Sequence, residues 1–387
     1  MKFDEAYFDQ GIDRVGTRCE KWDGARKEHS EDILPLWVAD MDFPSPPAVQ
    51  DALIRRAQHG TYGYTELLDD DFEALTAFWK RRHGLAVQKE DVLLLPCVIT
   101  GMRVAINALT QPGDGVIIQS PVYGPFRFSV EATGRKLMDA PLTRREDGRY
   151  DMNLAAVEEH LKNGASLMML CSPHNPISRP WTRQELSDLL ALLKRYDVPL
   201  VSDEIHADFV YAPGEFVPVL TVEQENVLSL CAPSKTFNLA GLQQASLLCP
   251  DEQVRKALEA QIEASGVRSG NLFALEATRA AYHEGDAWLD GLLGYLDGNR
   301  RLLAELVKEL LPKAVLTPLE ATYLGWLDLR AYCPTTEELM KRALAAGVYF
   351  TGGTFFGDAG EGFLRVNIGC PRRNIEEGIK RLAKALA

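Results

Sequence analysis

Three polar residues stand close to the ends of short apolar runs in the middle of the sequence: Asn175, Asp203 and Lys235. Apolar runs of this length are typical of strands in an α/β sheet, and such sheets bind ligands beyond the carboxyl ends of their strands. We therefore expect the amide, the carboxylate and the amine to meet. Together they suit a pyridine aldehyde with a ring hydroxyl: the amine condenses with the aldehyde, the carboxylate keeps the ring nitrogen protonated, and the amide binds the ring oxygen.

The elements that must position these side chains alternate between strand-like and helical patterns. Five apolar runs bounded by polar or turn residues read as strands buried on both faces, at 116–118, 167–170, 198–201, 227–230 and 246–248. Between them lie amphipathic stretches such as 182–196, which opens with Thr182 and Glu185 at the spacing of a capping box. The alternation predicts an α/β fold in which helices flank a mainly parallel sheet.

The sequence after about residue 285 has a different pattern. It predicts a long helix, two strands, a helix between them and a final helix, in the order 288–311, 323–329, 336–346, 362–368 and the last residues. Such an order is typical of a smaller α+β domain. We expect a large domain at 45–285 and a small domain made of 1–44 with 286–387.

Three motifs occur in a recognisable order: SPHNP at 172–176, VSDEIHAD at 201–208 and SKTFNLAGL at 234–242. Supporting segments lie almost end to end along the chain, at 21–23, 35–43, 62–65, 120–123, 322–324 and 364–372. With these motifs the chain resembles the fold-type I enzymes that use pyridoxal 5′-phosphate (PLP). More narrowly, it resembles the aminotransferase-like cystathionine β-lyases.

The resemblance implies a role for each residue around the PLP ring. Lys235 would bond the cofactor covalently and later act as the base that removes the Cα proton, rather than being an ordinary solvated lysine. Asp203 would pair with the ring nitrogen and Asn175 with the ring oxygen. Tyr123 would stack on the ring face. His206 would either contact the cofactor or only support Asp203, and both alternatives remain open.

The cofactor phosphate needs hydrogen-bond donors. Val98 and Ile99 precede a helical stretch that begins at Gly101, so their backbone N–H groups are expected to form an anion site. The hydroxyl of Ser234 is a further candidate donor. Many aminotransferases have a phosphate-binding arginine where this chain has Gln243, and the loss of that charge is typical of the lyase branch.

The resemblance also implies groups from the substrate side and from a second subunit. Arg365 would bind the substrate α-carboxylate through a bidentate pair, and Trp37 and Ala39 would line the same pocket. The glycine-rich stretch 352–357 resembles a loop that closes over the substrate. Tyr64 resembles the tyrosine that reaches the phosphate of the neighbouring subunit, which implies a homodimer with shared active sites.

Charge and cysteine content narrow the class of protein further. Among 387 residues, 42 are Lys or Arg and 55 are Asp or Glu, giving a formal charge of −13, which argues against nucleic acid or an anionic membrane as a partner. The seven cysteines are scattered without a CxxC pair, as expected for reduced thiols rather than disulfides or a metal site. The first residues are acidic, unlike a signal peptide, and no segment approaches ~20 apolar residues. We expect a cytoplasmic protein without a metal.

The reaction expected from the resemblance is α,β-elimination. The substrate would be L-cystathionine or a related cysteine thioether, and the products a thiol, pyruvate and ammonia. No second carboxylate-binding arginine is evident in the sequence, which fits such substrates. Two alternatives remain: a class I/II aminotransferase with the same fold and lysine, and a catalytically silent PLP-binding regulatory protein.

Overall fold

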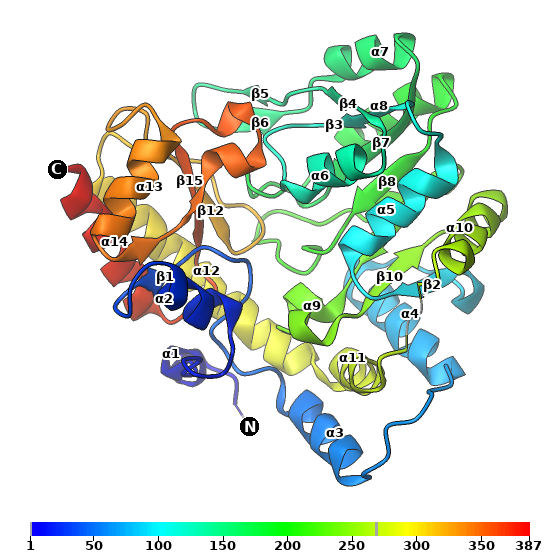
Figure 1. Cartoon of the computed structure of the whole chain (residues 1–387), viewed down its shortest axis with the longest axis horizontal. Coiled ribbons are helices and arrows are strands. Elements are labelled where there is room, and N and C mark those ends of the chain that lie inside the picture. The colour runs from blue at the N-terminus through cyan, green and yellow to red at the C-terminus, as the bar shows by residue number, and fades with distance from the viewer. Residues whose placement is uncertain (1, 268–269) are drawn as a thin grey trace.

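A computed structural model describes residues 2–267 and 270–387. Its largest sheet has seven strands in the order β2-β10-β9-β8-β7-β3-β4 (Figure 1). Their bounds are β2 Val92–Leu95, β3 Gly115–Ile118, β4 Lys136–Asp139, β7 Ala165–Cys171, β8 Leu200–Asp203, β9 Val227–Cys231 and β10 Ala245–Leu248. The five strands from β4 to β9 pair in parallel, whereas β10 is antiparallel to both β9 and β2. The predicted mainly parallel sheet is confirmed.

The five strands predicted from apolar runs are all present, with small shifts at their ends. β8 begins at Leu200 rather than Val198, because Pro199 has no N–H to donate to a neighbouring strand. Two strands of this sheet, β2 and β4, were not predicted. β4 lies at the edge of the sheet, and its sequence KLMD has the mixed polarity of a strand that is only partly covered.

Helices cover both faces of this sheet. The helices in this part of the chain are α3 Pro47–Gln58, α4 Asp69–His83, α5 Val98–Leu109, α6 Pro125–Ala132, α7 Leu154–Lys162, α8 Arg183–Arg195, α9 Pro233–Thr236, α10 Glu252–Ala264 and α11 Leu272–Glu284, and α3 packs on α11. Successive residues of β7 point to opposite faces: Leu167 and Met169 pack with α5, α6 and α10, whereas Met168 and Leu170 pack with α7 and α8. The apolar run 167–170 of β7 follows from this double burial.

The capping box predicted at the start of α8 is confirmed. The Glu185 backbone N–H donates to Thr182 Oγ1 at 3.2 Å, and the Thr182 backbone N–H donates to Glu185 Oε2 at 2.9 Å. The two bonds satisfy backbone donors that a helix start leaves open.

The C-terminal part forms a second, smaller sheet in the order β11-β12-β15-β14, with antiparallel pairs throughout. Its strands are β11 Val315–Leu316, β12 Leu324–Asp328, β14 Thr351–Gly352 and β15 Phe363–Asn367, and its helices are α12 Asp286–Leu310, α13 Thr336–Ala345 and α14 Arg372–Leu386. Two further strands, β5 Thr143–Arg144 and β6 Tyr150–Asp151, form a small hairpin.

The N-terminal segment packs with this C-terminal part. It contains α1 Glu5–Gln10, α2 Ala25–Glu28 and β1 Leu34–Pro35, and β1 pairs in parallel with β13 Val348–Tyr349. Figure 1 shows the blue N-terminal segment beside the red and orange C-terminal elements. The arrangement fits the expected small domain, whose boundaries at residues 44 and 286 stay a prediction. None of the helices in the described residues is long and apolar enough to cross a membrane.

Candidate active site

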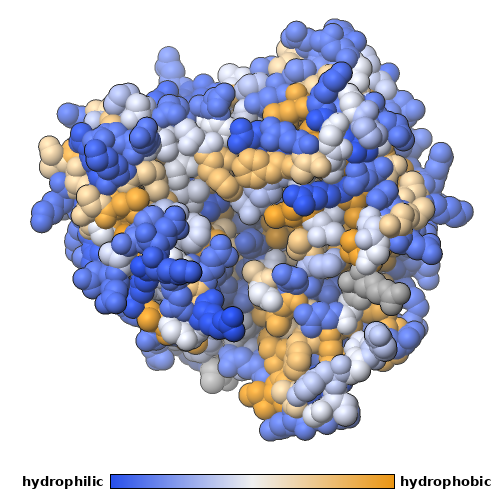
Figure 2. All heavy atoms as spheres, in the orientation of Figure 1, coloured by the Kyte–Doolittle hydropathy of each residue, from blue (hydrophilic) through white to orange (hydrophobic). Residues whose placement is uncertain are grey.

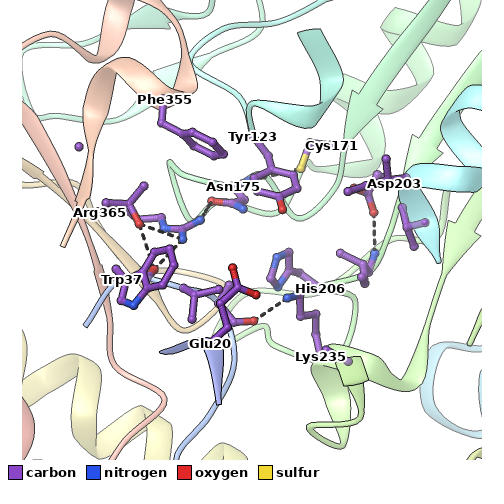
Figure 3. A pocket seen from close by; sticks show the side chains of 18 of the residues that line it. Glu20, Trp37, Tyr123, Cys171, Asn175, Asp203, His206, Lys235, Phe355 and Arg365 are labelled. Atoms are coloured by element: carbon purple, nitrogen blue, oxygen red, sulfur yellow. Dashed lines mark hydrogen bonds between the residues drawn. The ribbon is translucent and has the colours of Figure 1, made fainter. Parts of the chain in front are cut away.

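One cavity of about 1040 Å³ lies between the carboxyl ends of the large sheet and the edge of the small sheet. Figure 2, drawn in the orientation of Figure 1, shows a hollow near the centre of the molecule. Figure 3 shows the side chains that line the cavity. The cavity brings together all the site residues predicted from sequence except Tyr64. Parallel strands β7, β8 and β9 end at the same edge, and for that reason segments far apart in the sequence meet here.

Lys235 lies in α9, the one-turn helix that follows β9. Its Nζ donates to the backbone oxygen of Ala39 at 2.5 Å, although the two residues are 196 positions apart in the sequence. Burial lowers the pKa of the Lys235 amine from 10.5 to about 8. A substantial fraction of this amine is therefore neutral near pH 8, the form that attacks an aldehyde.

Asp203 ends β8 and is buried. One carboxylate oxygen accepts a hydrogen bond from the Ile205 backbone N–H at 3.1 Å. Burial raises the pKa of Asp203 from 3.8 to about 7. A buried carboxyl of this kind is stabilised in its charged form by a cationic partner, and a protonated pyridine nitrogen is such a partner.

Arg365, on β15, projects into the cavity from the small sheet and is 3% exposed. Its guanidinium donates to Trp37 O at 2.8 Å, to Thr351 Oγ1 at 3.3 Å and to Asn175 Oδ1 at 3.2 Å. Its Nε is buried without a partner among the described residues. Burial lowers its pKa to about 10, and all its bonds are to neutral oxygens. The group therefore favours an anionic ligand.

Asn175 follows β7 and is buried at the same place. Because its Oδ1 accepts from Arg365, its Nδ2 amide remains to donate to another oxygen. A ring hydroxyl oxygen beside Asp203 and Lys235 suits this donor.

The first turn of α5 faces the cavity with Val98 and Ile99. The helix begins at Val98 rather than Gly101, so the sequence-based start was wrong by one turn and these two residues lie inside the helix. The Gly101 N–H donates to Cys97 O at 3.1 Å, which is the first hydrogen bond of the helix. The N–H groups of the residues before Gly101 have no partner within the helix and can donate to a ligand. Backbone N–H groups at the start of a helix suit an anion such as a phosphate, so the predicted phosphate site at Val98 and Ile99 fits this geometry and stays a prediction. Gly101 also lets α5 lie close to β9, since a Cβ there would meet a Leu230 methyl at 2.4 Å.

Tyr123 and His206 complete the walls around the ring position (Figure 3). The Tyr123 backbone N–H donates to Asn175 O at 3.1 Å, and burial raises the pKa of its phenol. His206 is 3% exposed, packs edge-on against Tyr323, and has an Nδ1 without a partner in the described part of the chain. Burial lowers its pKa well below 6.5, so it stays neutral. Its bonding to a cofactor or to Asp203 stays a prediction.

Tyr64 lies outside the cavity of its own chain. The segment 59–68 between α3 and α4 has no regular structure, and Tyr64 in it is fully exposed. A side chain placed in this way has no role in the site of its own subunit, but it is available to a second copy.

Sequence reasoning missed several cavity residues contributed by the N-terminal segment and the C-terminal part of the chain. Glu20, Tyr349 and Met340 line the cavity, and the Tyr349 ring stacks on Trp37 at 4.8 Å between centroids. Thr351, just before the predicted 352–357 loop, helps to hold Arg365. The loop itself lines the cavity through Gly352, Thr354 and Phe355, whereas its closure over a substrate stays a prediction.

The donor set fits PLP. The cavity offers a helix N-terminus with free amides, an aromatic ring at Tyr123, a buried carboxyl at Asp203, an amide donor at Asn175 and an amine with a lowered pKa at Lys235. Ser234, Gln243 and Gln244 also line this cavity. Gln243 is the residue at the expected arginine position, so binding of a phosphate by the Ser234 hydroxyl and the backbone amides alone stays a prediction.

Comparisons with known proteins agree with this geometry. The family model "Aminotransferase class I and II" matches residues 31–382. Cystathionine β-lyase PatB of Bacillus subtilis is 38% identical over 386 residues, covering 98% of this chain and 100% of PatB. Protein MalY of Escherichia coli is 34% identical over 384 residues, covering 98% of each chain.

Two solved structures are similar over almost the whole chain. The PLP-bound putative aminotransferase of Clostridium difficile has a TM-score of 0.96 at 35% identity, covering 98% of this chain and 99% of that chain. The PLP-bound C–S lyase of Staphylococcus hominis has a TM-score of 0.91 at 29% identity, covering 98% of each. This chain belongs to the aminotransferase class I and II family. Within it, the predicted resemblance to fold-type I PLP-dependent enzymes of the cystathionine β-lyase kind is confirmed.

Proposed function

We propose that this protein is a PLP-dependent C–S β-lyase that cleaves L-cystathionine or related cysteine thioethers. The observation that carries the proposal is the convergence of Lys235, Asp203 and Arg365 in one cavity. The similarity to cystathionine β-lyase PatB and to the C–S lyase of Staphylococcus hominis supports elimination over other PLP chemistry.

The chain's own residues perform the acid–base work. Bound PLP supplies an electron sink for the charge that develops at the substrate Cα. Arg365 binds the α-carboxylate and orients the amino acid, and Asp203 holds a proton on the ring nitrogen. Lys235 Nζ takes the proton from Cα, for which its lowered pKa of about 8 is well suited.

The overall reaction balances with one water. The Cα–H and Cβ–S bonds break, the sulfur leaves as a thiolate that gains a proton, and the released enamine hydrolyses to pyruvate and ammonia. No oxidant or keto acid is consumed. An aminotransferase, by contrast, would need a keto acid for each turnover.

Incubation of the holoenzyme with cystathionine and no keto acid tests the proposal. Steady release of pyruvate and free thiol supports elimination. Turnover that requires a keto acid would instead identify an aminotransferase. PLP absorbance without product from any thioether amino acid would identify a catalytically silent binding protein.

We also propose that the enzyme works as a homodimer with shared sites. Tyr64, Tyr62, Ile54 and Leu68 are large apolar or aromatic side chains that are more than half exposed, and they cluster on α3 and the segment after it. Figure 2 shows apolar side chains gathered over α3 and α11. A surface of this kind on a monomer favours association, and Tyr64 would then reach the phosphate end of the partner's cavity.

We place the enzyme in the cytoplasm. All seven cysteines are free thiols, and all but Cys97 are buried. Proteins with many unpaired cysteines are typical of a reducing compartment.

A further inference from the structure

The half of the cavity beyond the cofactor groups has an aromatic wall. The rings of Trp37 and Tyr349 stack at 4.8 Å with 29° between their planes, and Met340 and Phe355 lie in the same lining. The Trp37 backbone oxygen also accepts from Arg365, so the wall begins beside the place where a substrate α-carboxylate binds. Apolar and aromatic surface at this point suits a substituent on the substrate sulfur that is itself apolar or aromatic.

The charges of the lining are unevenly distributed. Among residues 2–267 and 270–387, the Lys and Arg side chains that line the cavity are Lys235 and Arg365 alone. Both are used in the proposed reaction. The carboxylates beyond Asp203 are Glu20, Glu337 and Glu361, of which Glu361 accepts the Thr336 backbone N–H at 2.5 Å. The mouth of the cavity therefore carries negative charge without a basic group left to bind a second anion.

Glu20 is the carboxylate best placed to act on a substrate. Figure 3 shows its side chain pointing into the space between Trp37 and His206. Its charge is also felt inside the cavity: besides burial, the negative charges of Asp203 and Glu20 help to raise the pKa of Tyr123. Glu20 itself is exposed, so its effect on a ligand is moderate and depends on salt.

We propose that Glu20, together with the wall of Trp37 and Tyr349, selects thioethers whose sulfur substituent is aromatic or apolar and is neutral or positively charged. A negatively charged substituent is repelled by the carboxylates at the mouth of the cavity. The enzyme would thus gain specificity by disfavouring the wrong substrates. This inference rests on the proposed C–S lyase function and names the class of leaving thiol that the enzyme prefers.

Three S-benzyl cysteines of similar size test the selection. S-(4-aminomethylbenzyl)-, S-(4-methylbenzyl)- and S-(4-carboxybenzyl)-L-cysteine differ in the charge at the tip of the leaving group. With the holoenzyme, kcat/KM for pyruvate release should fall in that order, with the cationic substrate favoured over the anionic one by about tenfold at low salt. The difference should lie mainly in KM, because the charge contacts the tail equally before and during reaction.

Charge-changing variants assign the effect to Glu20. In Glu20→Gln the cationic-to-anionic ratio should fall to about threefold, and in Glu20→Lys it should fall below one. A general loss of activity lowers kcat/KM for both substrates equally, so it does not change the cationic-to-anionic ratio. Glu159→Gln removes an equal charge from an exposed position on α7, outside the cavity lining, and should leave the ratio unchanged. Added salt should narrow the ratio in the parent.

The outcomes separate this inference from the proposed function. Equal ratios in the parent and Glu20→Lys, with pyruvate released from all three substrates, would overturn the role of Glu20 and leave elimination intact. A parent enzyme that prefers the carboxybenzyl substrate would also overturn it. Absence of pyruvate from every substrate, cystathionine included, would overturn the lyase function itself.

Discussion

Asp203 shows how burial prepares a side chain for a charged partner. Its pKa is raised to about 7 by burial, so the cofactor-free protein holds this carboxyl partly protonated at neutral pH. When it pairs with a ring nitrogen it must be ionised, and the charge is then compensated. Replacement by Asn keeps an oxygen for the Ile205 N–H but removes the negative charge.

For Asp203→Asn we expect kcat to fall by about 10²-fold or more, because the ring nitrogen loses the charge that keeps it protonated. Steady-state pyruvate release measures the loss, and the circular dichroism spectrum checks that the variant folds. Asp151→Asn, a substitution at a partly exposed position outside the cavity lining, is a matched control. Parent-like kcat in Asp203→Asn would contradict the assigned role.

The same residue predicts a pH dependence of stability in the cofactor-free protein. The folded pKa of about 7 lies above the ordinary value of 3.8, so the unfolded chain releases this proton first and the contribution of Asp203 to stability falls as pH rises from about 4 to 7. Asp203→Asn lacks this titration. Urea unfolding at pH 5 and pH 8 should show the parent losing stability relative to the variant, and a constant difference would contradict the prediction.

Arg365→Lys keeps the positive charge but loses the planar pair of donors that matches a carboxylate. We expect KM for the amino acid to rise by about tenfold or more, with a smaller change in kcat. Kinetics with cystathionine measure both values. An unchanged KM would place the α-carboxylate elsewhere in the cavity.

At the scale of the elements, α9 determines where Lys235 points. Thr236 in this short helix donates from Oγ1 to Asp208 Oδ2 at 2.6 Å, and Asp208 Oδ1 lies 2.9 Å from His83 Nε2 on α4. Phe237 packs between Phe78 and Trp288 immediately after the helix. The C-terminus of α9 is therefore held by the hydrogen bond of Thr236 and by the packing of Phe237.

Thr236→Val has nearly the same shape but leaves Asp208 without this donor. We expect a loss of about 1–3 kcal/mol in the free energy of unfolding, together with lower kcat because Lys235 is held less firmly. Thr236→Ser retains the hydroxyl and should remain close to the parent in both measurements. Equal values for the Val and Ser variants would show that the hydrogen bond to Asp208 has no role.

The sequence was most informative where local pattern and burial agree. Short, mainly apolar runs predicted β7 and β9, and Thr182 with Glu185 predicted the start of α8, because those signals are contained in a few neighbouring residues. β4 was missed because an edge strand needs no apolar run. Glu20 and Tyr349 were missed because they reach the cavity only through tertiary packing of distant segments, which no local pattern records.

At the scale of the whole molecule, the protein carries a formal charge of −13 and yet places Lys235 and Arg365 together in its central cavity. The acidic surface disfavours polyanionic partners, whereas the buried cations favour the phosphate and carboxylate of small ligands. The proposed dimer extends this arrangement to two chains, because Tyr64 of one subunit would reach the cavity of the other.

Complementation between two impaired variants tests that dimer. Lys235→Ala removes the reacting amine, and Tyr64→Ala removes the side chain predicted to serve the partner's site. After unfolding and refolding of the two together, a mixed dimer contains one site with both groups intact, so activity should recover to about a quarter of the parent value. Recovery no greater than the sum of the separately refolded variants would contradict the shared site.

The central claim is the covalent attachment of PLP at Lys235. Borohydride reduction of the reconstituted protein, followed by proteolysis and mass spectrometry, locates the attachment directly. The account predicts one modified peptide containing Lys235, and none in Lys235→Arg treated in the same way. A modification on another lysine, or an unmodified Lys235 in protein that still releases pyruvate, would contradict it.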